Sequence, residues 1–464
     1  MAVLTILHTT CSESALFQKI FRFIRQHSRM KCFRPLLIGV FASICAAAQD
    51  QSVDRGIRER TGFAIPDANE KGQATFSLPA GITIGAVLPA DDAVAIALWN
   101  NTAFQAALAG LAISRADIIE ARQFRNPNFS TLLPVGPKPF EFLLAWPIEE
   151  LWQRRKRVKA AELNLDSVST GLVQNGLDLV RDVRLAYSDL WLAESRARVL
   201  SESADLRARL AGLTEKLRNA GDGTGLDVGM AQVDALSAAD LAQVARSEIE
   251  IARSRLRFVM GIADRTQRLA TNPDRVQRQP LPELATLLET AAANRPDLRA
   301  AELMVEVNAE RAKWQRSQIL ALMAPVLSIK EIGTEGVWAG PGLNMEIPIL
   351  SRNHGRISRT DAEVVRAGRD YAALKDRINK EVVEARERIL QTLASQNSLA
   401  QQVRPRVEAS IRITQRAYEN GDLSLLNVLE VTRQKFDIEL RELEMYVASE
   451  KARAELERAI GRRL

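Results

Sequence analysis

The side chains that most often perform catalysis or bind metal ions are concentrated at one end of this chain of 464 residues. All three cysteines and two of the three histidines precede residue 48: Cys11, Cys32, Cys45, His8 and His27. Only His354 lies beyond that point. If the first segment is removed, the remainder can form no disulfide, no Cys/His zinc site and no cysteine nucleophile, and a Ser-His-Asp triad would depend on His354 alone.

Other residue patterns that support chemistry are equally sparse. Aspartates and glutamates are frequent on the expected helices, but no pair stands out as a glycosidase-like dyad. Neither of the common glycine-rich phosphate loops occurs. His354 lies between Arg352 and Arg356 at the start of a long helix, which is more typical of a surface position than of a ligand. We therefore expect no catalytic residue, no metal site and no cofactor, and hence no enzyme.

Residues 30–48 have the composition of a secretory signal peptide. Its three parts are a basic region with Lys31 and Arg34, an apolar run from Leu36 to Cys45, and the small residues Ala46–Ala48. The apolar run is too short to span a bilayer, but it has the length of a signal sequence. The sequence therefore predicts an exported protein.

We predict that residues 1–48 are a removable leader. The true start is expected at Met30, because the residues before it add nothing that a signal peptide needs, and cleavage is expected after Ala48. Acylation of Cys45 is the alternative. A lipoprotein signal requires a small residue before the cysteine, whereas this chain has Ile44.

The leader carries almost all of the chain's basic excess. The whole chain has a formal net charge of +6, but six basic residues and one acidic residue lie within residues 1–48. The exported part is therefore close to neutral, at +1, which removes the main argument for nucleic acid as a partner. Beyond residue 48 no apolar run reaches the ~18 residues of a transmembrane helix. The exported protein is either soluble in the periplasm or crosses a membrane as β-strands.

The rest of the chain is a tandem repeat. Residues 219–261 align without gaps to residues 419–461, and the shared positions include the pairs Gly221-Asp222 and Gly421-Asp422. We predict four parts after the leader. They are an extended N-terminal segment at 49–90, a first repeat at 91–262, a linker at 263–283 and a second repeat at 284–464.

Each repeat contains the same four expected pieces: a helix, a short β segment, a very long helix and a return helix. In the β segments, apolar residues such as Phe142, Leu144 and Leu343 alternate with other residues, as is typical of strands. The expected helices cover 91–125, 149–218 and 226–262 in the first repeat, and 284–318, 353–418 and 426–460 in the second.

The long helices are predicted to form coiled-coil hairpins. The first contains a row with heptad spacing, here called the leucine row: Leu185, Leu192, Val199, Leu206 and Leu213. The second contains the corresponding row Ile378, Val382, Ala385 and Ile389. About 70 residues at a rise of ~1.5 Å make a helix of roughly 100 Å. Pro405 is expected to bend or break the second long helix, because it removes one hydrogen bond of the helix.

Four strands per chain cannot close into a pore, because even small membrane barrels use about eight. If three chains share their strands, about twelve surround an aqueous lumen. The predicted fold class is therefore mainly α with a small β part. Duplicated long coiled-coil helical hairpins form an α-barrel, and four β-strands per chain contribute to a trimeric 12-stranded transmembrane β-barrel.

Residues 90–464 resemble the outer-membrane efflux proteins of the TolC type. The resemblance rests on the repeat, on the strand ends Trp146-Pro147-Ile148 and Ile347-Pro348-Ile349, and on the turns at 219–222 and 418–424. It implies a homotrimeric, passive channel in the outer membrane of a Gram-negative bacterium, with a helical extension through the periplasm. It also implies three partners: a periplasmic adaptor (membrane fusion) protein, an inner-membrane efflux pump and outer-membrane lipid.

Two segments are similar to the metal-efflux branch of that family. They are Asn126-Pro127-Asn128-Phe129 and the basic segment at 153–159. The branch usually has a Gly-Gly-Lys-Arg-like element where this chain has Trp152-Gln153-Arg154-Arg155. The strands also look short, particularly at 128–135. The transported substrate stays open between metal ions, drugs and secreted proteins.

The resemblance further implies functional positions at the hairpin turns. The adaptor would dock at Gly221, Asp222, Gly421, Asp422, Leu423 and Ser424. Side chains just beyond the turns would narrow the pore at Asp227, Asn427 and Glu430. Three Glu430 carboxylates brought together by three-fold symmetry would attract cations and repel one another. The simpler interpretation is that the glycines only end their helices and that Glu430 is a solvated surface residue.

Two other functions are compatible with an exported coiled-coil chain. A periplasmic adaptor also contains a helical hairpin, but it would have one hairpin flanked by β-rich domains instead of two complete repeats. An exported coiled-coil scaffold or enzyme is the third hypothesis. The ordered duplication of helix, strand and hairpin favours the efflux channel over both.

Overall fold

The computed structural model describes most of the chain beyond residue 51. The described residues are 52–65, 76–85, 87–132, 141–221, 223–263, 269–272, 280–318, 323–332, 336–345, 352–420 and 422–464. The chain divides into two units, Met1–Ser52 and Val53–Leu464. All strands and labelled helices belong to the second unit. The predicted leader at 1–48, with its start at Met30 and its Cys45, lies outside the described residues.

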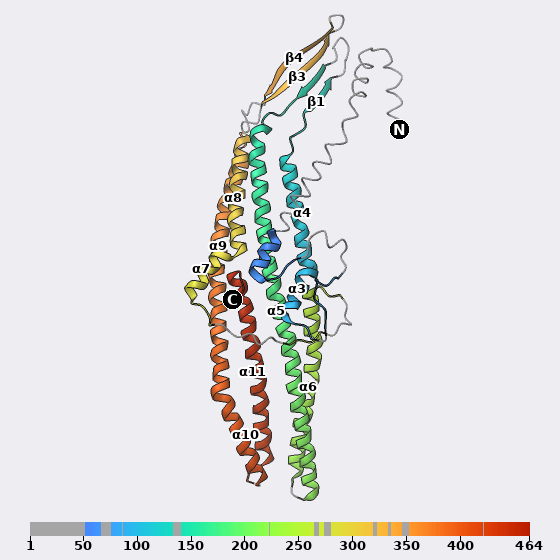
Figure 1. Ribbon diagram of the computed structural model, residues 1–464, viewed down its shortest axis with the longest axis vertical. Coiled ribbons are helices and arrows are strands. Elements are labelled where there is room, and N and C mark those ends of the chain that lie inside the picture. The colour runs from blue at the N-terminus through green and yellow to red at the C-terminus, as the bar shows by residue number, and fades with distance from the viewer. Residues whose placement is uncertain are drawn as a thin grey trace, which may run out of the picture. The chain divides into compact units, whose positions relative to one another are not determined.

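The order of elements repeats along the second unit (Figure 1). The first pass comprises α3 (Ala90–Asn100), α4 (Thr102–Arg122), β1 (Asn128–Leu132), β2 (Glu141–Ala145), α5 (Glu150–Ala220) and α6 (Gly225–Met260). The second comprises α7 (Leu284–Asn294), α8 (Pro296–Ser317), β3 (Met323–Ile332), β4 (Gly336–Met345), α9 (His354–Ser398), the π-helical turn η4 (Leu399–Val403), α10 (Arg404–Glu419) and α11 (Leu425–Ile460). The predicted class, duplicated long helical hairpins with a small β part, is confirmed.

The four strands form one antiparallel sheet in the order β1-β2-β3-β4. The pairing of β2 with β3 joins the two repeats at the centre of the sheet. β1 and β2 have five residues each, whereas β3 and β4 have ten each. The expectation of short strands therefore holds for the described part of the first repeat and not for the second. Residues 133–140 lie outside the described part.

The leucine row does not form the contact between α5 and α6, contrary to the prediction. Leu185, Leu192, Val199 and Leu206 are only half-buried, and Leu213 is 46% exposed. The buried row has the same heptad spacing but lies two residues earlier: Val183, Leu190, Ala197 and Ala211. Ala197 packs with Ala242 and Ala245 of α6 in one cluster. Small side chains allow two helices to approach closely, which favours this face over the leucines.

The second hairpin follows the predicted row. Ile378, Val382, Ala385 and Ile389 are buried together with Leu456 of α11. Near Pro405, Arg404 donates its backbone N–H to the carbonyl of Leu399, five residues earlier, as in a π-helix. Pro405 then stands in the first turn of α10, where its missing N–H is not needed. The predicted disruption is confirmed, and its form is one π-helical turn.

The helix before the strands is broken in both repeats, whereas one helix was predicted at 91–125 and one at 284–318. α4 starts after Asn101, whose side chain accepts a hydrogen bond from the Phe104 N–H at 2.9 Å. α8 starts at Pro296, which suits the first position of a helix. Both start signals are visible in the sequence, but alanine-rich helical residues surround them and concealed the breaks.

Tertiary packing explains where these breaks fall. The return helices α6 and α11 end at Gly261 and Gly461, whose φ angles are 71° and 76°. A Cβ atom on Gly261 would lie 2.2 Å from the carbonyl oxygen of Asn100, and one on Gly461 would lie 2.9 Å from that of Asn294. Each return helix therefore ends directly against the break in the first helix of its own repeat.

The N-terminal segment at 49–90 is not extended throughout, which corrects the prediction. Residues 52–61 are helical, and Val53 and Ile57 on this helix are fully buried. Ile57 packs so closely on Gly176 of α5 that a Cβ atom there would lie 2.8 Å from its Cδ1. Five charged residues between positions 52 and 61 concealed this short apolar face in the sequence.

A network of ion pairs joins the second return helix to α5 and α9. Arg458 of α11 lies 2.7 Å from Asp178 of α5 and shares Glu381 of α9 with Arg295. The side chain of Arg295 is 1% exposed. Burial lowers the pKa of Arg295, but hydrogen bonds and charges from Asp297 and Glu381 outweigh it and raise the pKa overall. Since an unpaired buried charge is costly, the partners of Arg295 offset its burial, and the pair of Arg458 with Asp178 links the two repeats.

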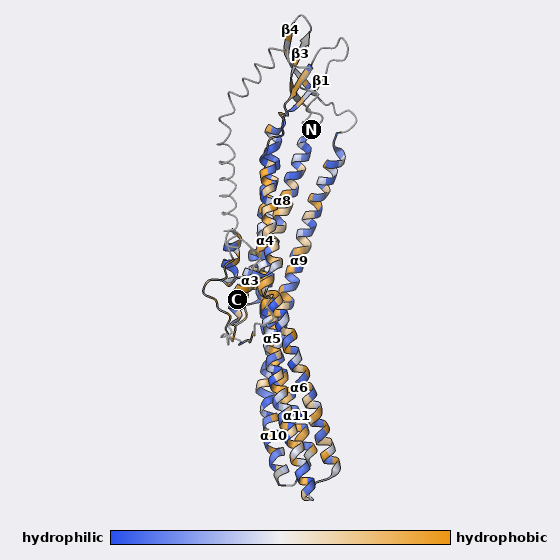
Figure 2. Cartoon of the chain, turned by 90° about the vertical axis from the view of Figure 1, so that its right-hand side faces the viewer, coloured by the Kyte–Doolittle hydropathy of each residue, from blue (hydrophilic) through white to orange (hydrophobic). Residues whose placement is uncertain are grey.

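Apolar residues follow the helices as narrow rows separated by polar faces (Figure 2). None of the described helices is both long and apolar enough to cross a membrane. The largest core cluster forms where α3, α5 and the end of α6 meet residues 53–65, and it includes the fully buried Leu190, Leu256 and Met260.

We expect Gly261→Ala to destabilise the protein. The added Cβ would collide with the Asn100 carbonyl, and alanine disfavours a φ of 71°, so strain and overpacking each cost about 1–3 kcal/mol. Thermal unfolding should show a lower midpoint. Gly229→Ala in the same helix, where nothing lies within 4 Å of the new Cβ, is the control and should stabilise by about 0.5–1 kcal/mol. Equal losses in both variants would contradict the close contact.

Candidate functional site at the hairpin turns and the sheet

The turns of the two hairpins lie side by side, at the end of the helices opposite to the sheet (Figure 1). Leu429 of α11 is buried in one cluster with Ala211 of α5 and Ala231 of α6. Tyr418, at the end of α10, packs against the same cluster. The structure therefore brings the two predicted docking turns together into one surface.

The first turn is held by a glycine cap and a capping box. Gly221 has a left-handed φ of 93° and donates its N–H to the Arg218 carbonyl at 3.0 Å. Thr224 begins α6: its hydroxyl accepts a hydrogen bond from the Asp227 N–H at 3.1 Å, and its own N–H donates to the Asp227 carboxylate at 3.3 Å. Asp222 lies outside the described residues.

The second turn ends its helix differently. The Asp422 N–H donates to the Ala417 carbonyl at 2.8 Å, the six-to-one hydrogen bond of a Schellman ending. Gly421 lies outside the described residues. Leu423 is half-buried, while Ser424 is exposed and occupies the N-cap position of α11.

Two of the three predicted pore residues have a local structural role. Asn427 donates its side-chain N–H to the Ser424 hydroxyl at 3.1 Å, which matches the pairing of Asp227 with Thr224 in the first repeat. Both side chains thus support the start of a return helix. Glu430 is exposed and accepts hydrogen bonds from neighbouring side chains of its own helix. A pore role remains a prediction for all three residues.

Sequence reasoning did not select the most exposed apolar residues beside the turns. Leu226 is 71% exposed, and Leu426 at the equivalent position of the second repeat is 57% exposed. The signal was present, because the two leucines are identical across the repeat and stand in the first turn of a return helix. Two exposed leucines beside one surface are suited to apolar contact with a partner.

One face of the sheet is apolar. The register places Leu144 opposite Leu327 and Phe142 opposite Ile329. The rings of Phe129 and Phe142 stack on this face, with their centroids 6.0 Å apart. The face comprises Phe129, Phe142, Leu144, Pro325, Leu327, Ile329, Val337, Ala339, Pro341 and Leu343, and its polar exceptions are Thr131 and, near the end of β3, Glu331 opposite Val337.

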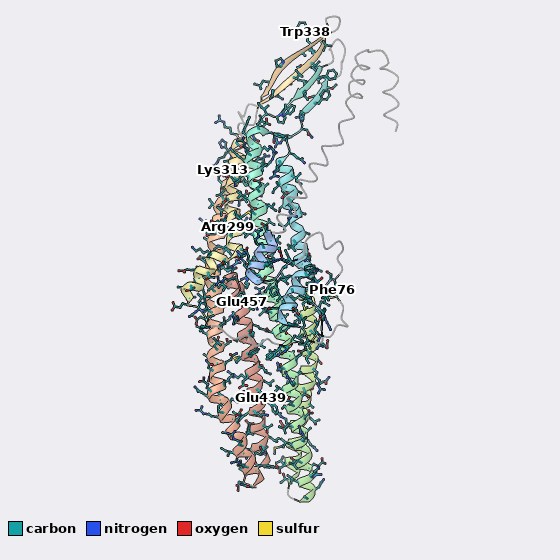
Figure 3. All side chains as sticks on the ribbon, in the orientation of Figure 1. Phe76, Arg299, Lys313, Trp338, Glu439 and Glu457 are labelled. Atoms are coloured by element: carbon teal, nitrogen blue, oxygen red, sulfur yellow. The ribbon has the colours of Figure 1, made fainter. Side chains whose placement is uncertain are left out.

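The opposite face is mixed and carries most of the polar side chains. It includes Ser130, Glu141, Ser328, Lys330 and Asn344. The Ser328 hydroxyl donates to the Glu141 carboxylate at 3.4 Å. Trp338 lies on this face near the far end of the β3–β4 pair and is 62% exposed (Figure 3). The period-two alternation predicted from the sequence therefore separates an apolar face from a partly polar one.

No metal site is formed by the described residues. Among them, no group of three or more His, Cys, Asp or Glu side chains is placed to hold a metal ion. His354 starts α9 and is exposed, as are Arg352 and Arg356 beside it. This arrangement agrees with the interpretation of His354 as a surface residue.

The family model for outer membrane efflux proteins matches residues 140–262 and 287–462, so the chain belongs to this family. Each matched segment contains one complete helical hairpin, α5 with α6 or α9 to α11. The protein is therefore an outer-membrane efflux channel and a transport protein, not an enzyme.

Individual relatives agree with this assignment. The cobalt-zinc-cadmium resistance protein CzcC of Cupriavidus metallidurans is 25% identical over 383 residues, which cover 81% of this chain and 90% of CzcC. The solved structure of CusC matches with a TM-score of 0.68 at 18% identity, over 85% of this chain and 99% of CusC. The outer-membrane channel OprN matches with a TM-score of 0.67 at 19% identity, over 80% of this chain and 90% of OprN. The two structures share the fold of this chain.

We expect the apolar face of the sheet to contact lipid. Leu327→Arg, in the middle of this face, should then impair outer-membrane assembly, because a cation near the bilayer midplane costs about 2–4 kcal/mol. Ser328→Arg is the matched control, since Ser328 lies on the opposite face beside Glu141. Immunoblots of outer-membrane fractions measure both variants. Loss of the Ser328 variant with retention of the Leu327 variant would reverse the assignment of the two faces.

Proposed function

We propose that three copies of this chain form an exit duct in the outer membrane that works with a periplasmic adaptor and an inner-membrane pump. The observation that carries the trimer is the open sheet, in which β1 and β4 are both edge strands. Unpaired backbone groups are costly in lipid. Pairing β4 of one copy with β1 of the next removes both edges, and three copies close about twelve strands around a lumen.

Uncovered apolar rows on the first hairpin support the same assembly. α6 carries exposed residues at coiled-coil spacing: Leu226 (71%), Val233 (65%), Val244 (50%), Ile251 (56%) and Phe258 (80%). The leucine row of α5 is also incompletely covered. Helical residues at this spacing normally pack on a neighbouring helix. Neighbouring copies around a three-fold axis supply such helices, which explains why these rows stay open in a single chain.

Two features indicate the partners: the sequence of the chain has no nucleotide-binding loop, and the turns expose apolar residues. Its sequence contains no nucleotide-binding loop, so energy for transport comes from another protein. The joined turns expose Leu226, Leu426 and Ser424 at the end of the helices opposite to the sheet. If the sheet is in the outer membrane, this surface points into the periplasm and is the natural contact for an adaptor.

The cargo is best tested first with metal ions. CzcC, which is 25% identical to this chain, is named as a cobalt-zinc-cadmium resistance protein. The described residues form no metal-holding group, which suits a passive duct because tight binding would retain the cargo. A deletion strain grown on cobalt, zinc and cadmium salts and on lipophilic drugs, side by side, separates metal export from drug export.

Ser424→Cys tests adaptor docking. Residues 49–464 contain no cysteine, so an introduced thiol is the only attachment point for a photo-crosslinker. In whole cells we expect Ser424→Cys to crosslink to a periplasmic adaptor. Ser358→Cys, an exposed serine at the other end of the second hairpin, is the control and should not crosslink to it. Mass spectrometry identifies the product.

Two results would overturn this proposal. One is equal crosslinking of the adaptor to both positions, which would exclude docking at the turns. The other is a monomeric mass of the wild-type protein in mild detergent, which would exclude the trimer.

Glu430→Gln tests the pore constriction. A ring of three carboxylates favours cations, so its neutralisation should move the ratio of cation to anion permeability toward one in planar bilayers. Glu444→Gln is the control, because Glu444 is an exposed glutamate further along the same helix. Unchanged selectivity in the Glu430 variant would contradict a pore role and leave Glu430 as a surface residue.

A further inference from the structure

The junction between the helices and the sheet carries a large excess of positive charge. Four segments at the ends of α4 and α8 and the beginnings of α5 and α9 contain twelve Arg or Lys residues and two acidic residues: 122–127, 149–157, 311–318 and 352–359. Figure 3 marks one of these cations, Lys313, in the half of α8 nearer the sheet. Since residues 49–464 as a whole carry only +1, this charge is a local feature.

Only part of this charge is neutralised within the chain. Glu150, whose side chain is 1% exposed, pairs with Arg125 at 3.1 Å and with Arg157 at 2.9 Å. Four more of the twelve cations pair with carboxylates outside these segments: Arg122, Lys313, Arg316 and Arg359. Within the described part of the chain, no carboxylate forms an ion pair with Arg155 or Arg356, and both residues are exposed. These cations are available for a ligand of opposite charge.

The beginning of α5 places two cations beside a tryptophan. Trp152, Arg155 and Lys159 are exposed and spaced by three and four residues, so they form one row on the helix surface. Burial and the charge of Glu162 raise the pKa of Asp166. Lys159 opposes this rise, because its positive charge stabilises the Asp166 carboxylate. Because Lys159 already interacts with Asp166, Arg155 is the more available of the two cations.

A second exposed tryptophan stands between the strands and this row along the chain. Trp146 is 55% exposed and stands two residues after Leu144, so it continues the apolar face toward the helices. Its backbone N–H donates to the Pro325 carbonyl at 3.1 Å, which extends the sheet contact to this residue. Along the chain, apolar strand residues are thus followed by two exposed tryptophans and then by two exposed cations. We call Trp146, Trp152, Arg155 and Lys159 the aromatic–basic row.

The row faces the outside of the proposed duct. Arg155 and Val173 are eighteen residues apart, which is five turns of an α-helix, so they share a face of α5. Val173 is buried there by the N-terminal segment, since a Cβ atom on Gly56 would lie 2.9 Å from Val173 Cγ2. A helix face covered by another segment does not line the lumen. The aromatic–basic row on the same face is therefore directed outward.

Resting on the proposed function, which places the sheet in the outer membrane, we propose that the aromatic–basic row binds the phosphate headgroups of anionic phospholipids in the leaflet nearest to the helices. Tryptophan is enriched at membrane–water interfaces, where its ring meets headgroups. Exposed cations just below that level attract anionic lipid. The guanidinium of Arg155 matches phosphate with two parallel hydrogen bonds. The pairing of tryptophans with cations favours lipid over free phosphate, which would use the cations alone.

The test uses the full chain, purified in mild detergent and stripped of lipid. Native mass spectrometry counts bound phosphatidylglycerol and, separately, phosphatidylcholine. The variant Arg155→Gln/Lys159→Gln should bind phosphatidylglycerol about tenfold more weakly than the wild type and should leave phosphatidylcholine binding unchanged. The control, Arg209→Gln/Lys216→Gln, removes two exposed cations from the other end of α5 and should behave as the wild type.

Three outcomes decide the proposal. Equal phosphatidylglycerol binding by the wild type and the Arg155/Lys159 variant would overturn it. Displacement of the lipid by millimolar inorganic phosphate would also overturn it, because the site would then recognise the phosphate group without the rest of the lipid. Conductance in phosphatidylcholine bilayers tests the proposed duct separately from the proposed lipid site. If the wild type forms no channel but binds phosphatidylglycerol through the aromatic–basic row, the duct is refuted and the lipid site is supported.

Discussion

Backbone hydrogen bonding at the two edges of the sheet constrains the rest of this structure. A four-stranded antiparallel sheet leaves one row of N–H and C=O groups open on β1 and another on β4. Water satisfies such groups in a soluble protein, but lipid does not. In the proposed trimer, further copies of the chain supply the missing strands. The uncovered apolar rows on α5 and α6 point to the same solution for the helices.

The duplication is the second feature that organises the structure. Its two repeats differ where they contact other parts of the molecule. Both return helices end at a left-handed glycine that packs against the break in the first helix of the repeat, at Gly261 and Gly461. At the turns, an acid–threonine capping box in the first copy corresponds to an amide–serine contact in the second. The ion pairs of Arg458 with Asp178 and of Lys451 with Asp189 then join the two repeats to each other. The caps at the ends of the helices thus occur in both repeats, whereas each contact between the two repeats occurs only once.

The sequence predicted the long elements well because their signals are local and strongly periodic. The hairpins, the disruption at Pro405 and the second apolar row at Ile378–Ile389 depend on heptad spacing or on proline, and the structure has them. The prediction failed where two faces of one helix carried similar rows. On α5 the leucines were the more apolar choice, but the alanine-rich row two residues earlier makes the contact because it lets the helices approach. The helix at 52–61 was missed because its apolar face is only Val53 and Ile57.

By itself, the sequence determined the class of the protein, because the repeat, the hairpins and the alternating strands all depend on residue types and spacing. Only the tertiary structure decided which residues share a surface. Strand register placed Leu327 and Ser328 on opposite faces, and helix geometry aligned Arg155 with Val173 over five turns. The capping role of Asp227 and the contact of Asn427 with Ser424 also required coordinates, because a side chain that could line a pore turns back to a backbone or hydroxyl group within its reach. Such choices depend on distances of a few ångströms, which spacing along a chain does not specify.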